Sequence, residues 1–190
     1  MIQNIGEFAT KVALEANLAL SDFKLRPPIE SAGLRSLLQA NSLPIEISEI
    51  LYAQHDGQEY GSLKLFGEFA MLSIEESIDL YTEMVAEFVD YKMGHSADLR
   101  IRGETIWRRK WYPFAWDQNR NDHLCLDFDP TVEGTIGQVI YCPKWGNHTV
   151  HGTSFANFLD WYYTKLNNVN FQVGDGPLEE FNCRVNPLDI

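Results

Sequence analysis

The stretch NDHLCLDFDP, residues 121–130, holds the side chains that are best suited to chemistry. If it forms a strand, its side chains alternate between two faces, and one face carries the set His123, Cys125, Asp127 and Asp129. An imidazole, a thiol and two carboxylates could bind a metal ion or supply an acid and a base for hydrolysis. The alternative is a polar, solvated face of a sheet.

Strand geometry argues against a metal site on this face. Alternate side chains of a strand lie about 6.5 Å apart and point in parallel, so neighbours in the row do not converge on one ion. The remaining histidines show no recognised ligand spacing, and the chain has no GxSxG, HExxH or P-loop motif. We therefore expect no metal, no cofactor and no catalytic residue. A metal-dependent hydrolase using His123 and Asp127 is kept as the least favoured alternative.

Composition indicates a globular protein with an acidic surface. The chain has 190 residues, 45% of them hydrophobic, and a formal net charge of −12. Such a charge repels phosphate, which opposes binding to nucleic acid or to an anionic membrane and favours a basic partner. Three cysteines without a CxxC pair, and no signal sequence or membrane-spanning stretch, predict a cytoplasmic protein. The sequence does not define an oligomeric state.

Hydrophobic periodicity predicts helices in the first third of the chain, over residues 1–20, 29–40 and 43–57. A hairpin around Gly67 follows, and then a helix over 73–93, where Ser73 and Glu76 form a capping box. Strands are expected near 108–116, 123–129, 136–142 and 148–152, then a helix over 153–168, and turns with a short strand in the last twenty residues.

This order predicts an α+β fold, in which a mostly antiparallel meander is flanked by helices. We expect a single domain over 27–190, with 1–26 as an N-terminal helical extension that ends at two prolines. The strand alternation and the last helix predict a shared core of Leu124, Leu126, Phe128, Val139, Phe155 and Leu159.

Two further motifs have mainly structural interpretations. In AQHDGQEYG, Gly57 can adopt the left-handed conformation that ends a helix, and Asp56 can bond to the backbone of the turn. The basic and aromatic stretch RIRGETIWRRKWYPFAW could suggest a nucleic-acid surface. Arginines that protect a sheet edge and tryptophans such as Trp111 in the core are the better interpretation for an acidic protein.

Five segments in order resemble a known family. They are LPIEISEILYAQHDGQ, KLFGEFAMLSIEES, WYPFA, HLCLDFDPTVEGTIGQVI and TSFANFLDWYY, and they run from Leu43 to Tyr163. They are similar to the cell-wall-assembly-regulator (SMI/KNR-like) family of the SUKH superfamily. The resemblance implies an α+β fold without enzymatic activity. It also implies that bacterial members are immunity proteins that neutralise toxin domains, often nucleases, and that the fungal founding member is a signalling scaffold.

The resemblance and the charge together predict a noncatalytic protein-binding module of the immunity type. Its partner would be a basic toxin domain, and a regulatory scaffold in cell-wall assembly is the alternative. We expect contacts with the partner from Asp56, Gln58, Trp116, Asp127 and Asp129. We expect support of the fold from Gly57, Trp111, Pro130 and Gly137.

Overall fold

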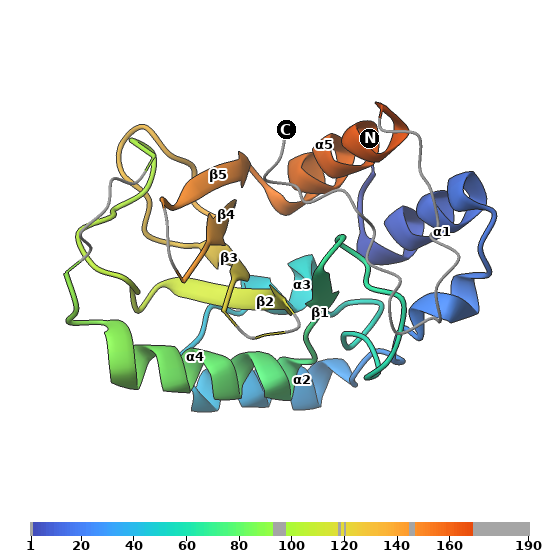
Figure 1. The fold of residues 1–190 in the computed structure, drawn as a ribbon. Helices are drawn as coiled ribbons and strands as arrows, with labels where there is room; N and C mark the ends of the chain where they lie inside the picture. Colours follow the sequence, from blue (N-terminus) through green and yellow to red (C-terminus); the bar gives the residue numbers. More distant parts are fainter. Residues whose placement is uncertain (1, 93–97, 118, 120, 145–146, 169–190) are drawn as a thin grey trace.

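A five-stranded antiparallel sheet forms the centre of the protein in a computed structural model, which describes residues 2–92, 98–117, 119, 121–144 and 147–168 (Figure 1). The strands follow one another across the sheet in chain order, as a meander. Their bounds are β1 Phe69–Met71, β2 Trp111–Asp117, β3 His123–Asp127, β4 Gln138–Cys142 and β5 Thr149–Gly152. The predicted meander is therefore confirmed.

Helices flank this sheet. They are α1 Ile5–Ala16, the 3₁₀ helix η1 Leu20–Phe23, α2 Ser31–Ala40, α3 Glu46–Ile50, α4 Ile74–Phe88 and α5 Phe155–Asn168. In Figure 1, α2 and α4 lie below the sheet, whereas α5 lies above it. The α+β class is confirmed. The turns and short strand expected in the last twenty residues lie outside the described residues.

The predicted hairpin around Gly67 does not form as a pair of strands. Phe66 and Phe69 make a single bridge across the turn, and β1 pairs with the distant β2 instead. The reason is a side chain: Oε1 of Gln58 accepts the N–H groups of both Leu65 and Met71, at 3.1 and 3.0 Å. Backbone donors on both sides of the turn are thus satisfied by Gln58 rather than by a ladder.

Two helices are shorter than predicted, and α4 begins as predicted. The α3 helix covers only Glu46–Ile50, and Tyr52 beyond it is buried with its hydroxyl 2.8 Å from Ser77 Oγ. The capping box of α4 is confirmed, because Ser73 Oγ accepts the Glu76 N–H and Glu76 Oε2 accepts the Ser73 N–H. This helix ends at Phe88 rather than near 93.

Both faces of the sheet are buried. One face packs on the main core, which includes all the predicted core residues, with Phe128 at its edge. A second cluster covers the other face and consists of Ile101, Trp107, Trp111, Cys125, Ile140 and Cys142, with Met84, Val85 and Phe88 of α4 against it. The prediction of a solvated polar face is therefore wrong for His123, Cys125 and Asp127, which are at most 4% exposed.

The N-terminal helix packs into the main core. The Phe8 ring lies 5.6 Å from that of Phe66 and 6.0 Å from that of Tyr162 on α5. In addition, the Ile2 N–H donates to Asp160 at 2.7 Å. The assignment of 1–26 as a separate extension stays a prediction. None of the helices in the described part of the chain is both long and apolar enough to cross a membrane.

Candidate functional site

The five residues predicted to contact a partner lie at two ends of the sheet. Trp116 pairs with His123 at one end of β2 and β3, whereas Trp111 pairs with Asp127 at the other end. Trp116 lies five positions after Trp111 along β2, which places the two ends about 16 Å apart. Asp127 and Asp129 therefore do not form one surface with Trp116.

Asp127 is an interior residue that fixes the connection between β3 and β4. It is fully buried, its Oδ2 accepts from Gln138 Nε2 at 2.9 Å, and its Oδ1 accepts the Asp129 N–H at 2.9 Å. Burial raises the pKa of this carboxyl group. Gly137, at φ +82°, donates its N–H to the Asp127 carbonyl at 2.7 Å. The LDFDP and GTIGQV motifs thus hold the turn closed, and Asp127 is removed from the predicted contacts.

Asp129 is engaged by two arginines. Its Oδ2 lies 3.1 Å from Arg108 Nη2, and its Oδ1 lies 3.4 Å from Arg102 Nε. Arg102 Nε also donates to the carbonyl of Pro130 at 3.1 Å. The negative charge of Asp129 is therefore balanced within the chain, and the arginines of the basic stretch tie the 98–110 segment to the turn.

Gln58 is also an interior residue, only 4% exposed. Its Nε2 donates to the carbonyls of Phe23 and Leu63, at 2.9 and 2.7 Å, while its Oε1 accepts the two N–H groups named above. Asp56 is half-buried and accepts the Ile74 N–H at 2.8 Å, at the start of α4. The HDGQ motif thus joins three segments of chain, because the glutamine side chain bonds to backbone groups in each of them.

The remaining predicted contact, Trp116, lines a hollow of about 350 Å³ that we call the Trp116 groove. The 58–64 loop, β1, the end of β2 and the first turn of α4 surround it. Its lining residues are Gln58, Glu59, Tyr60, Gly61, Ser62, Lys64, Ala70, Met71, Leu72, Glu76, Trp116 and Asp117. Ala70 is the cross-strand partner of Trp116, so its small side chain leaves room beside the indole.

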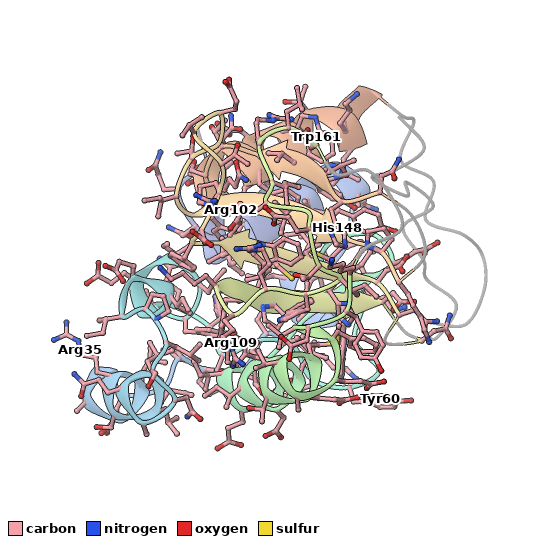
Figure 2. All side chains as sticks on the ribbon, turned by 90° about the vertical axis from the view of Figure 1, so that its left-hand side faces the viewer. Arg35, Tyr60, Arg102, Arg109, His148 and Trp161 are labelled. Atoms are coloured by element: carbon pink, nitrogen blue, oxygen red, sulfur yellow. The ribbon has the colours of Figure 1, made fainter. Side chains whose placement is uncertain are left out.

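An aromatic side chain stands at the mouth of the groove. Tyr60 is 99% exposed and projects outward from the surface (Figure 2). In the same view, Arg35, Arg102 and Arg109 stand apart from it. A solvent-exposed tyrosine beside a half-buried tryptophan is typical of the aromatic residues that contribute most of the binding energy in protein interfaces. Sequence reasoning missed Tyr60, although its place in a polar loop between Glu59 and Gly61 was a usable signal.

The groove carries more negative than positive charge. Glu59, Glu76 and Asp117 line it, against Lys64 as the cation among its lining residues. Arg26 beside the groove pairs with Glu76 at 3.1 Å. Burial lowers the pKa of Lys64, and it raises the pKa of Asp56 behind the groove. The groove therefore combines apolar side chains with a small excess of carboxylates.

The predicted alternative, in which His123 and Asp127 act as an acid and base pair, does not fit their separation. Asp127 lies four positions farther along β3 than His123, which is about 13 Å along a strand and too far for direct proton transfer. In the described residues, no group of three histidine, cysteine or carboxylate side chains is placed to hold a metal ion. His123 is instead a buried imidazole between the Trp107 ring and β4.

We expect acid to destabilise the fold through His123. Burial lowers its pKa to about 4 in the folded protein, against 6.5 as its ordinary value. Well above pH 6.5 the His123 imidazole is neutral in both the folded and the unfolded protein. Between pH 6.5 and 4 only the unfolded state gains the proton, so about 3 kcal/mol of stability is lost as the pH falls through this window.

Urea unfolding at several pH values between 7.5 and 4 measures this loss. The His123→Gln variant is the comparison, because its side chain does not titrate. The free energy of unfolding of this variant should fall less over the same window. Burial also lowers the pKa of His151 to about 4, so the loss of stability due to His151 remains in both proteins. An identical pH dependence in both proteins would contradict the role of His123.

A comparison with models of known protein families gives a match. The model of the SMI1/KNR4 family (SUKH-1) matches residues 41–161 of the chain. This range includes the HDGQ motif, the Trp116 groove and the whole sheet. Among curated proteins, none matches the sequence.

Proposed function

The chain belongs to the SMI1/KNR4 family (SUKH-1), and from this we propose that it is an immunity-type protein that binds and neutralises a basic toxin domain. It acts without catalysis, in the cytoplasm, and through the Trp116 groove. Membership of the family supports a protein partner in general. The toxin domain, its basic character and the surface used are our proposal.

The observation that carries the proposal is the pairing of aromatic anchors with carboxylates at one groove. Tyr60 and Trp116 offer apolar area, and Glu59 and Asp117 lie directly beside them in sequence. Opposite charges on a partner accelerate association, and a desolvated aromatic centre slows dissociation. The net charge of −12 extends this preference for basic partners to the whole molecule.

A regulatory scaffold in cell-wall assembly signalling is the second candidate, and the same family membership supports it. The two functions differ in the partner. An immunity protein should bind a single toxic domain tightly and abolish its toxicity, whereas a scaffold should bind host signalling proteins without any effect on toxicity. Coexpression with the protein encoded by each neighbouring gene separates them, since the immunity function requires that this chain restore growth against a toxic one.

Replacing Tyr60 by Ala should weaken binding to that toxin domain about tenfold or more, because an exposed aromatic anchor is lost. The stability of the free protein should stay within about 0.5 kcal/mol. Ile136→Ala is the matched control, since Ile136 is 73% exposed and lies in the β3–β4 turn, at the opposite end of the sheet. Titration calorimetry gives both affinities. Equal affinities for the two variants would exclude the groove as the interface.

Charge at the groove should act mainly on the rate of association. Glu59→Gln should slow association about two- to threefold at low salt and leave dissociation nearly unchanged. Glu133→Gln removes one exposed carboxylate from the β3–β4 turn and should have a smaller effect. Stopped-flow measurements at two salt concentrations provide the comparison. An effect of Glu133→Gln as large as that of Glu59→Gln would mean that only the overall charge matters.

A further inference from the structure

A second hollow lies farther along α4, on the side of the sheet that carries Cys125 and Cys142. We call it the His123 pocket. It has a volume of about 230 Å³, and its walls include Glu83, Met84, Glu87, Phe88, Trp107 and His123. It neighbours the Trp116 groove, because Trp116 and His123 are direct partners across β2 and β3. The two hollows therefore belong to one stretch of surface beside α4.

Two buried polar atoms of the pocket lining have no hydrogen-bond partner among the described residues: the Trp107 indole N–H, which is a donor, and His123 Nε2, which is an acceptor. His123 is 4% exposed, and its Nε2 is buried with no hydrogen bond to any described residue. A hydrogen bond to the backbone of Cys142 holds the ring, and the Trp107 ring stands against it at 5.9 Å. Burial lowers the pKa of the imidazole, which is therefore neutral at pH 7. One ring nitrogen donates its N–H to the backbone of Cys142, so the other nitrogen presents a lone pair. A buried acceptor of this kind is stabilised by a ligand that donates to it.

The rest of the pocket is built for a cation on an apolar stem. Met84 and Phe88 are half-buried, while Glu83 and Glu87 are exposed one turn apart on the same face of α4. Asp117 and Asp122 add a negative field at His123. Lys144, on the opposite side, has its Nζ 3.2 Å from Asn121 Oδ1. The two carboxylates of the lining exceed Lys144 in charge, which favours a cationic ligand.

We propose that the His123 pocket takes the side chain of an arginine presented by the basic partner, an inference that rests on the proposed function. The arginine methylenes would pack on Met84 and Phe88, and a guanidinium N–H would donate to His123 Nε2. Glu83 and Glu87 would balance its charge. Arginine fits better than lysine because its planar head carries donors in several directions, so that one N–H can reach His123 while others face the carboxylates.

Small arginine compounds test the pocket without the partner. N-acetyl-arginine methylamide should shift the NMR signals of the His123 imidazole and the Trp107 indole, with saturation in the millimolar range expected for so small a ligand. The corresponding citrulline compound, which is neutral and has the same shape, should bind at least tenfold more weakly. The lysine compound should fall between them. Equal binding of the arginine and citrulline compounds would overturn the proposal.

Substitutions on α4 test whether the arginine compound binds in the His123 pocket. Glu83→Gln with Glu87→Gln should weaken binding of the arginine compound at least fivefold, whereas Glu75→Gln with Asp79→Asn on the same helix should not. All four side chains tested are exposed, so folding is retained. Unchanged binding in the first double variant would also overturn the proposal.

The same double variants separate this inference from the proposed function. If the toxin domain binds and depends on Tyr60 but not on Glu83 and Glu87, the interface stands and the arginine pocket is wrong. If the arginine compound binds as expected and no toxin domain does, the pocket stands and the immunity function is wrong.

Discussion

Replacing Gln58 by Leu is expected to lower the free energy of unfolding by about 4 kcal/mol or more. The leucine side chain has nearly the same size but forms no hydrogen bond. Four buried backbone groups would lose their partner, namely the carbonyls of Phe23 and Leu63 and the N–H groups of Leu65 and Met71. Each unsatisfied group costs about 1 to 3 kcal/mol, and partial relaxation keeps the sum near the lower end.

Equilibrium unfolding in urea measures the change. Gln54→Leu is the control, because Gln54 is an exposed glutamine four residues earlier in the same loop. Its replacement should change the stability by less than about 0.5 kcal/mol. A loss below about 1 kcal/mol for Gln58→Leu would mean that the loop rearranges to satisfy its own backbone, and that Gln58 does not hold the three segments together.

Replacing Gly57 by Ala should have an effect of similar size for a steric reason. Gly57 has φ +72°, and an added Cβ would lie 2.4 Å from the backbone carbon of Leu72 and 2.4 Å from the Ser73 nitrogen. These are backbone atoms at the start of α4 and cannot move independently of the helix. We expect a loss of about 3 kcal/mol or more, in which the left-handed conformation itself accounts for about 1 to 2 kcal/mol.

The chain offers a matched control for this strain. Gly61 has φ +71°, and an added Cβ there meets no atom within 4 Å. Gly61→Ala should therefore cost only the conformational part, about 1 to 2 kcal/mol. Thermal unfolding of the two variants separates the two contributions. Equal losses would show that the close approach of Gly57 to Leu72 and Ser73 is unimportant.

Local signals in the sequence predicted much of the fold. The capping box of Ser73 and Glu76 placed the start of α4, because it depends only on residues three apart. The strands from Trp111 onward are connected by short turns, which leaves the meander as the simple arrangement. The hairpin around Gly67 is limited to the Phe66–Phe69 bridge, and its short length was not predicted since Gln58, which bonds to both of its arms, is not part of the local pattern.

The site was harder to predict because burial depends on distant segments. Alternation in β3 correctly separated two faces, but it could not show that the face with Asp127 is covered by the 98–110 segment and α4. Polar residues at such a face are normally solvated, and here Gln138 satisfies Asp127 instead. Trp116 was predicted as a contact and does line a groove, whereas its neighbours from the 58–64 loop are brought there by the tertiary structure.

The central claim is that a basic protein partner covers the Trp116 groove, and amide hydrogen exchange with and without the candidate toxin domain tests it most directly. We predict that the partner slows exchange in residues 59–64, 70–72 and 116–117, and leaves the β3–β4 turn at 129–136 unchanged. Slower exchange confined to that turn, or no change anywhere in the presence of bound partner, would contradict the account.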